Sequence, residues 1–296
     1  MGQRVPERAL VAETTAPRDA PLSVPAGRLG GRVGHAVFWV AIWTLALAGL
    51  LYLLLPTLII VLASFTAGEY ITFPPHGLSL RWFARLMALE EVRTSAWRSL
   101  IVATAATAVA VVLGVAAAFP LVRGRFAGRE ALNAFLMSPL ILPSLVYGLA
   151  GLMFVSAIGV PLSVPVLVLS HVAIIVPYVI RTTAASLALL DPHLEEAARS
   201  LGANAWKTFL RVILPNLLPG IATGAAFAFI SSFDNLTVSL FLAGPRVETL
   251  PIRLFAMINF DLDPAAAAIS AVLVLITFAV VLLAHWAVGL TRVVRL

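Results

Sequence analysis

The chain has 296 residues, of which 61% are hydrophobic and only 11% charged, and its mean hydropathy is +1.01. This apolar surface exceeds what one water-soluble core could bury, which excludes an ordinary soluble domain and indicates that the solvent is partly lipid. The net charge is +6, but no basic surface interleaved with aromatic residues is visible, which argues against nucleic-acid binding.

The first 35 residues differ in composition from the rest of the chain. Residues 1–35 mix Arg, Pro, Gly and Ala without apolar periodicity, and we expect a disordered tail there. The first apolar run begins too late and is too long for a cleavable signal peptide, so it is interpreted as a retained anchor. Residues 36–296 are expected to form a single transmembrane domain.

Six apolar runs are long enough to cross a bilayer as helices, since a helix needs roughly twenty residues to cross a hydrocarbon core of ~30 Å. Helices are favoured because a backbone in lipid must satisfy its own hydrogen bonds, and the alternating pattern of membrane barrels is absent. We therefore predict an all-α membrane protein with six transmembrane helices. They are predicted at residues 36–65, 100–122, 131–158, 164–190, 214–243 and 265–290.

Charge placement gives the expected orientation. Six crossings put both termini on one side, and the loops on that side carry an excess of Arg and Lys, whereas the far side is balanced. Positive loops are typical of the cytoplasmic face. Both termini and the loop 191–213, between the fourth and fifth crossings, are therefore predicted to be cytoplasmic.

That loop, within DPHLEEAARSLGANAWKTFLRVILP (residues 191–215), is amphipathic. Asp191 and Pro192 are typical of a helix start, Gly202 of a helix end, and Asn204 of a second start. The spacing predicts two short helices joined at a glycine elbow. Leu194, Ala197, Ala198 and Leu201 share the apolar face of the first helix, opposite Glu195, Glu196, Arg199 and Ser200, and Trp206, Phe209, Leu210 and Ile213 share the apolar face of the second. Periodicity alone is equally consistent with a loop that rests on anionic lipid headgroups.

The order of residues in this loop resembles a family signature. Glu196-Ala197-Ala198, three residues, Gly202, nine residues and Val212-Ile213-Leu214-Pro215 resemble the EAA motif of binding-protein-dependent ABC importer permeases, with valine where isoleucine is usual at 212. Residues 64–83, 232–235 and 241–255 are most similar to spermidine/putrescine-type permeases. Asn235 departs from the acidic residue expected after Asp234.

The resemblance implies a coupling helix that docks on a separate ATPase. Glu196 would make the polar contact, Ala197 and Ala198 would permit close packing, and Gly202 would set the bend. The implied coupling residues are Leu194, Glu195, Glu196, Ala197, Ala198, Arg199, Leu201, Gly202 and Trp206. The implied partners are two ATP-binding subunits, a second permease chain that is a copy or a paralogue, and an extracytoplasmic solute-binding protein in a bacterial cytoplasmic membrane.

The residues themselves argue that the energy source lies on another polypeptide. A phosphate-cradling P-loop needs Gly-Lys followed by Ser or Thr, and the sole lysine, Lys207, follows Trp206. We therefore expect no enzymatic activity and no bound cofactor in this chain, with ATP-Mg on the partner.

The absence of cysteine excludes thiolate metal sites, and His171 and His285 are isolated, so no metal site is expected. The resemblance implies a small solute as cargo, such as a polyamine or another small organic cation.

Two stripes mark the fifth predicted crossing. Gly220, Gly224, Ala228 and Ser232 form a small-residue ridge that predicts close helix packing, and Thr223, Phe227, Ser231 and Asp234 form a more polar stripe, the candidate substrate path. A carboxylate at mid-bilayer costs roughly 2.5–3.5 kcal/mol, so Asp234 should face a cavity or a partner, unless the helix ends before it near the outer surface.

Two other functional classes are weighed against an ATP-driven permease. A secondary carrier driven by an ion gradient would need matched discontinuous helices, and no convincing inverted repeat is visible. An intramembrane enzyme would need a nucleophile, base or metal-ligand motif, and none is found.

Overall fold

The computed structural model describes residues 28–70, 73–244, 247–261 and 263–293. In this part of the chain the structure is helical, and the one extended pairing is an isolated antiparallel bridge between Thr66 and Leu78. The predicted all-α class is confirmed. The chain divides into two units, residues 1–54 and 55–296. Residues 1–27 lie outside the described ranges, so most of the tail predicted for residues 1–35 is untested.

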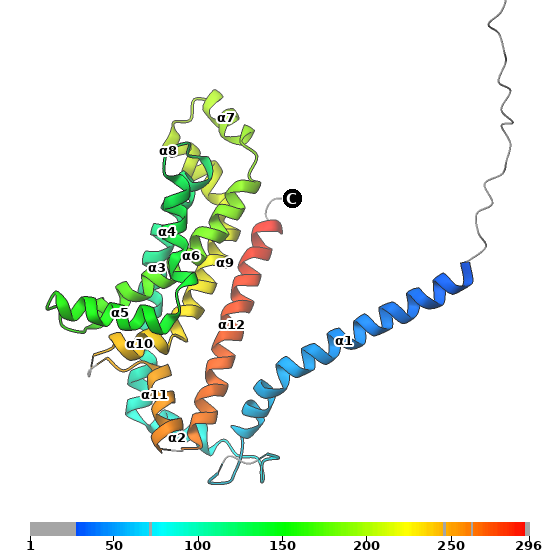
Figure 1. Cartoon of the computed structure of the whole chain (residues 1–296), viewed down its shortest axis with the longest axis vertical. Helices are drawn as coiled ribbons and strands as arrows, with labels where there is room; N and C mark the ends of the chain where they lie inside the picture. The colour runs from blue at the N-terminus through cyan, green and yellow to red at the C-terminus, as the bar shows by residue number, and fades with distance from the viewer. Residues whose placement is uncertain (1–27, 71–72, 245–246, 262, 294–296) are drawn as a thin grey trace, which may run out of the picture. The chain divides into compact units, whose positions relative to one another are not determined.

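Five helices among the described residues are long and apolar enough to cross a membrane, or six if a bent pair counts as one span. Figure 1 labels the elements in chain order. The spans are α1 (Arg28–Ala63), α3 (Glu90–Arg123), α6 (Val164–Leu189), α9 (Leu214–Phe233) with its preceding turns, and α12 (Ala265–Val293); the bent pair is α4 (Arg129–Ile141) with α5 (Ser144–Ala157). The shorter elements are α2 (Arg81–Ala88), α7 (His193–Ser200), α8 (Ala205–Thr208), η1 (Phe209–Ile213), α10 (Thr237–Leu242), α11 (Leu250–Ala256) and η2 (Met257–Asp261).

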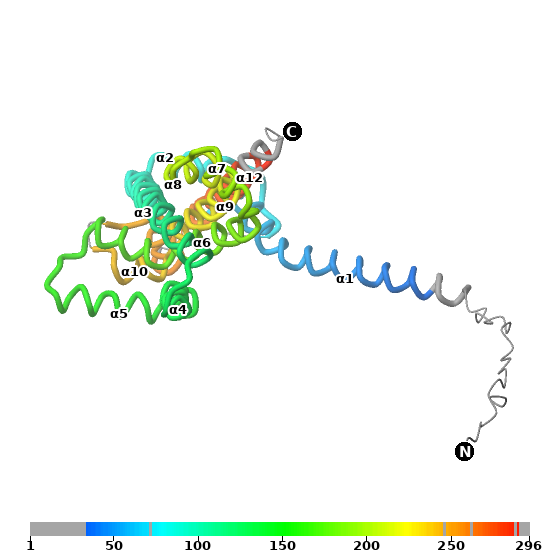
Figure 2. The backbone as a smooth tube through the Cα atoms, turned by 90° about the horizontal axis from the view of Figure 1, so that it is seen from above, coloured from blue at the N-terminus to red at the C-terminus, as the bar shows by residue number. Residues whose placement is uncertain are grey.

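The third predicted crossing, 131–158, is not one straight helix. It bends by 105° between α4 and α5, so that α5 runs across the direction of α4 in Figures 1 and 2. Pro143 occupies the N-cap of α5 with extended backbone. Proline has no backbone N–H and cannot continue the hydrogen-bond ladder of α4, which explains where the break falls.

The fifth predicted crossing, 214–243, also breaks. Helix α9 ends at Phe233, Asp234 is its C-cap, and the chain turns through Asn235 and Leu236 before α10 begins at Thr237. The prediction of one helix through residue 243 was wrong, and the helix ends at Phe233, as in the alternative. The other part of that alternative, a position of Asp234 near the outer surface, stays a prediction. Asn235 causes part of this break because its Oδ1 accepts a hydrogen bond from Val238 N at 2.9 Å and caps α10.

Helices α3, α6 and α9 pack closely because small residues line their contacts. The ridge on α9 faces α6: a Cβ added at Gly224 would lie 2.9 Å from Val179 Cα, and one added at Gly220 would collide with the Ser186 hydroxyl. On α3, a Cβ at Gly114 would lie 2.7 Å from the Val179 side chain. The predicted packing role of the small-residue ridge is therefore confirmed.

The two ends of this helical bundle carry different elements. Helix α7 lies at one end, called here the α7 end, and α2 and α11 lie near the other (Figure 1). At the α2 end, ion pairs join Arg85 to Asp263 at 3.0 Å and Arg253 to Glu91 at 2.6 Å.

Candidate functional site

The loop 191–213 folds locally much as its sequence predicts. Pro192 is the N-cap of α7, and Asp191, directly before it, accepts a hydrogen bond on its Oδ1 from His193 N at 3.0 Å. Asn204 Oδ1 accepts a hydrogen bond from Lys207 N at 2.8 Å and starts the next helical segment. Between them Gly202 has φ of +82°, a backbone conformation that side chains disfavour. The predicted glycine elbow is confirmed.

The second predicted short helix is not separate. Helix α8 continues through the π turn η1 directly into α9, so one span runs from Ala205 to Phe233. Within it Trp206 stacks on Phe209, with ring centroids 6.0 Å apart, and Phe209 meets Phe119 of α3 edge-on at 6.1 Å. A movement of the elbow is therefore connected directly to a membrane-spanning helix.

The apolar face of α7 is exposed rather than covered by its own chain. Leu194 is 44% exposed, Leu201 89% and Trp206 67%, and Ala197 is also exposed while Ala198 is half-buried. Large apolar side chains grouped on an otherwise charged loop are typical of a surface that binds a partner or a membrane.

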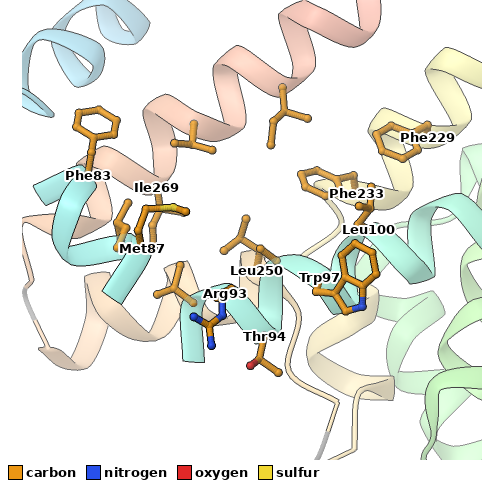
Figure 3. Close-up of a pocket in the computed structure, with 15 residues that line it drawn as sticks. Phe83, Met87, Arg93, Thr94, Trp97, Leu100, Phe229, Phe233, Leu250 and Ile269 are labelled. Carbon is orange, nitrogen blue, oxygen red and sulfur yellow. The ribbon is translucent and has the colours of Figure 1, made fainter. Parts of the chain in front are cut away.

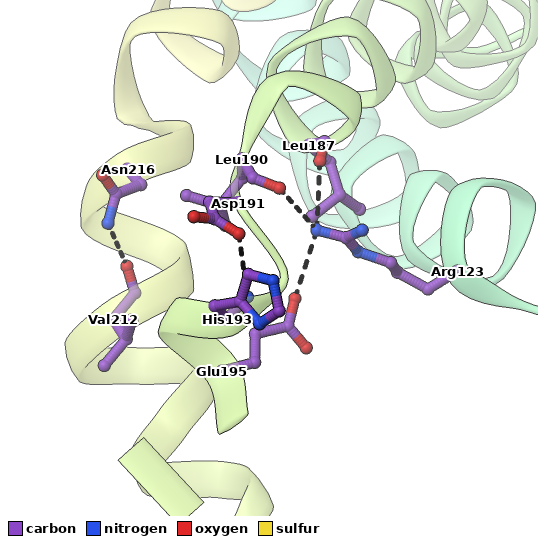
Figure 4. A network of polar contacts seen from close by, with 8 residues as sticks. All are labelled: Arg123, Leu187, Leu190, Asp191, His193, Glu195, Val212 and Asn216. Carbon is purple, nitrogen blue, oxygen red and sulfur yellow. Dashed lines mark hydrogen bonds and ion pairs between the residues drawn. The ribbon is translucent and has the colours of Figure 1, made fainter. Parts of the chain in front are cut away.

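The two glutamates of α7 have different surroundings, which corrects the prediction that they share one polar face. Glu195 is largely buried and pairs with Arg123 of α3 at 3.4 Å. The same Nη2 of Arg123 donates hydrogen bonds to the carbonyls of Leu190 at 2.9 Å and Leu187 at 3.4 Å, at the end of α6 (Figure 4). Carbonyls at a helix C-terminus attract cations, so one guanidinium joins α3, α6 and α7.

Glu196 instead points outward. Its side chain is 72% exposed, and its Oε2 lies 3.2 Å from Nδ1 of His193. That hydrogen bond, together with the charges of Asp191 and Glu196, raises the pKa of His193 above its ordinary value. Arg199 is also exposed. Glu196 is therefore placed where a partner can reach it, and Glu195 is not.

A cavity of about 420 Å³, called here the break cavity, lies where the α4–α5 bend meets the gap between α9 and α10. Its polar lining residues are Ser144, Tyr147, Tyr178, Ser231, Asp234, Asn235 and Thr237, and the remaining described lining residues are Pro, Leu and Ile. It brings together Ser231 and Asp234 of the predicted substrate path. The other two members of that path do not line it: Thr223 donates to the carbonyl of Pro219 in its own helix at 2.8 Å, and Phe227 is 53% exposed.

Two tyrosines of the break cavity were missed by sequence reasoning. Tyr147 comes from α5 and Tyr178 from α6, and the Tyr147 hydroxyl donates to the carbonyl of Ser170 at 3.2 Å. Polar aromatic residues inside apolar runs, one of them just after the break at Pro143, were the available signal. Without the bend, nothing in the sequence places them beside Asp234.

A buried histidine connects the elements on both sides of the α9–α10 break. His171 of α6 is 1% exposed, its Nδ1 lies 2.7 Å from the Ser232 hydroxyl of α9, and its Nε2 lies 3.1 Å from the Ser239 hydroxyl of α10. The interpretation of His171 as a hydrogen-bonded packing residue fits this environment. His285, in contrast, is exposed on α12.

A second, larger cavity of about 860 Å³ lies among α2, α3, α9 and α12 (Figure 3). Its lining is almost entirely apolar, with side chains such as Leu86, Phe229 and Ile269, and Arg93 is the charged residue on its described wall. The described lining of this cavity contains no acidic side chain.

Comparison with known proteins shows the relationships of the chain. Residues 110–291 match the family model of the binding-protein-dependent transport system inner membrane component. The chain is 35% identical over 225 residues to the putrescine transport system permease protein PotI of Escherichia coli K12, covering 74% of this chain and 80% of the relative. It is 30% identical over 234 residues to the spermidine/putrescine permease PotC of Haemophilus influenzae, covering 79% and 91%.

Other relatives and solved structures share the fold but differ in named cargo. A probable molybdenum ABC transporter permease of Haloferax volcanii is 35% identical over 254 residues, covering 82% of this chain and 88% of the relative. Among solved structures, a bacterial alginate ABC transporter in complex with an alginate-bound periplasmic protein aligns with a TM-score of 0.67 at 17% identity, covering 90% and 99%. The MetNI methionine ABC transporter aligns with a TM-score of 0.58 at 15% identity, covering 70% and 98%.

Proposed function

The chain belongs to the family of binding-protein-dependent transport system inner membrane components, as the permease component of an ABC importer, and on that premise we propose that its cargo is a small organic cation of the polyamine type. Identity alone does not choose the cargo, because the polyamine and molybdenum relatives are similarly close. The break cavity favours a cation, since Asp234 is its one ionisable acid or base among the described lining residues apart from the tyrosines.

For the coupling of transport to ATP hydrolysis, we propose that α7 docks on an ATP-binding subunit. The observation that carries this proposal is the exposure of Leu194 on α7 and of Leu201 and Trp206 just after it, on the same loop as the exposed Glu196. Exposed apolar anchors on a loop with accessible charges fit the cleft of a protein partner. The other predicted coupling residues, Glu195, Ala197, Ala198, Arg199 and Gly202, then shape, pack or bend this contact.

The proposed assembly contains two such ATP-binding subunits, which hold ATP-Mg, a second permease chain and an extracytoplasmic solute-binding protein. The α7 end and both termini face the cytoplasm, because the basic loops lie on that side. Nucleotide-driven closure of the ATP-binding pair would then push α7 and, through Phe209, the span that contains α9. Within that span the proposed path includes Thr223 and Phe227 as well as Ser231 and Asp234.

A pair of glycine variants tests the coupling role. Gly202 and Gly128 both have positive φ, and an added Cβ at either would meet open space, so Gly202→Val and Gly128→Val introduce comparable backbone strain of roughly 1–2 kcal/mol. We expect Gly202→Val to abolish ATP-dependent uptake at normal membrane abundance, because the elbow positions α7, and Gly128→Val to reduce uptake only in proportion to abundance.

The Glu196→Lys variant provides a second test of the coupling role. Reversing this exposed charge should weaken co-purification of the ATP-binding subunit without affecting membrane insertion of the permease. Normal uptake by both Gly202→Val and Glu196→Lys would show that α7 is not the coupling element and would favour a loop that merely rests on lipid.

A further inference from the structure

We propose that the break cavity is a recognition site for an ammonium group, with Asp234 as the counter-ion and Tyr147 and Tyr178 as aromatic walls. This inference rests on the proposed import function and specifies the chemistry of its membrane path. It goes beyond a general substrate route because it names the recognised group and three residues that act together, two of them unsuspected from the sequence.

Asp234 carries a charge that no neighbouring cation balances. Among the described residues it has no ion-pair partner, and its exposed side chain lines the break cavity between two helical segments. A carboxylate within a membrane-spanning region is costly unless a cation or hydrogen-bond donors compensate it. The described lining of the break cavity contains no Lys, Arg or His, so a cationic ligand would supply that compensation.

The orientation of α9 also favours a cation at the break. Its last turn ends at Phe233, directly beside Asp234, and the carbonyl end of a helix carries partial negative charge. Ser231 adds a hydroxyl oxygen on the cavity side of the same turn. Broken helices of membrane transporters use such carbonyl ends to coordinate cations, and the α9–α10 break provides one here.

The aromatic lining of the break cavity also favours an ammonium group. Tyrosine rings attract ammonium groups through their quadrupole, and Tyr147 and Tyr178 line the cavity from two different helices. The hydrogen bond from the Tyr147 hydroxyl to the Ser170 carbonyl restricts the position of that ring. An ammonium group beside Asp234 would therefore meet a carboxylate, a helix end and two tyrosine rings, of which that of Tyr147 is restrained.

Hydrogen bonds fix the chain on both sides of the break. His171 is hydrogen-bonded to Ser232 and Ser239, which flank the break, and the Asn235 Oδ1 accepts a hydrogen bond from Val238 N at the start of α10. Asn235 is therefore a structural residue at this position, and its lack of charge leaves Asp234 to set the charge of the cavity. The larger cavity, with Arg93 on an apolar wall, offers the opposite electrostatics.

The absence of cysteine from the chain allows a direct test. The assembled importer in lipid nanodiscs carries Ser231→Cys, which places a thiol inside the break cavity. Two thiol reagents are compared, a cationic trimethylammonium-ethyl methanethiosulfonate and an anionic sulfonatoethyl methanethiosulfonate. The rate at which each one labels this chain is measured by mass spectrometry. The ratio of the two rates is then compared with the ratio in Ser231→Cys combined with Asp234→Asn.

We expect Asp234→Asn to lower the cationic-to-anionic ratio about tenfold, a factor that corresponds to about 1.4 kcal/mol. Putrescine should slow labelling of the Asp234 protein, whereas 1,4-butanediol, a neutral molecule of the same length, should not. A ratio insensitive to Asp234→Asn, or equal protection by the diol, would overturn the ammonium site. Thr237→Cys, which also lines the cavity, replaces Ser231→Cys if that variant does not assemble.

The two proposals fail in different ways. If labelling shows no charge selectivity but the contrast between Gly202→Val and Gly128→Val holds, the ammonium site is wrong and the coupling assignment stands. If the labelling pattern is as expected but the glycine variants behave alike, the cavity binds cations in a protein whose coupling element lies elsewhere.

Discussion

His171 shows how a buried polar residue can stabilise a break in a membrane helix. A neutral imidazole has one N–H donor and one acceptor nitrogen, and the hydroxyls of Ser232 and Ser239 can satisfy both. The three side chains come from α6, α9 and α10, so their hydrogen bonds hold the two sides of the break against one common helix. The position of Asp234 depends on this arrangement.

Removing one hydroxyl should therefore destabilise the protein more than a single exposed hydrogen bond would. We expect Ser232→Ala to cost about 1–3 kcal/mol, since it leaves a buried imidazole nitrogen unpaired. Ser170→Ala is the matched control, because that half-buried hydroxyl bonds to the Val166 carbonyl of its own helix at 2.8 Å. Thermal denaturation of the detergent-solubilised complex measures both. Equal midpoints for the two variants would refute the proposed role of His171.

At the scale of elements, Arg123 is the contact through which α7 reaches the membrane helices. It binds the end of α6 and the side chain of Glu195 at once, so displacement of α7 changes contacts to both α3 and α6. Helix α7 is also covalently joined at both ends, to α6 through residues 190–192 and to α9 through the Gly202 elbow, α8 and η1. Together these links give a partner bound at α7 access to three of the spans.

Arg123→Gln should consequently reduce the solute imported per ATP hydrolysed more than it reduces assembly. The Arg123 side chain is 25% exposed, so the lost ion pair is worth about 1 kcal/mol, roughly a fivefold change in an equilibrium. Glu195→Gln should behave similarly, and the double variant should be less impaired than the two losses added together. Arg125→Gln, at an exposed neighbouring position, serves as the control. Strict additivity would mean that the pair does not act as a unit.

The elements also show which features a sequence reveals. Gly202 and Asn204 were predictable because caps and elbows depend on a few adjacent residues. The bend at Pro143 was not, because Pro139 lies inside α4 and local rules do not choose between the two prolines. Asp234 stood out as a charge in an apolar run. Arg123, which pairs with Glu195, and the two tyrosines, which line the same cavity as Asp234, come from distant segments, and only the packed helices bring them together.

At the scale of the whole molecule, the chain has a proposed substrate path and a proposed docking loop, but its sequence lacks a P-loop. Its charges fit this arrangement, with basic loops at the α7 end and an acidic residue at the helix break. The central claim is that transport by this chain requires a separate ATP-hydrolysing partner that acts through α7.

Uptake into proteoliposomes tests that claim most directly. One set contains the purified chain alone under a proton or sodium gradient, and another contains the chain with its ATP-binding subunits, second permease and solute-binding protein, supplied with ATP. We predict accumulation of labelled putrescine only in the second set, with loss on Gly202→Val. Accumulation of putrescine at full rate by the chain alone, driven by the ion gradient, would contradict the central claim.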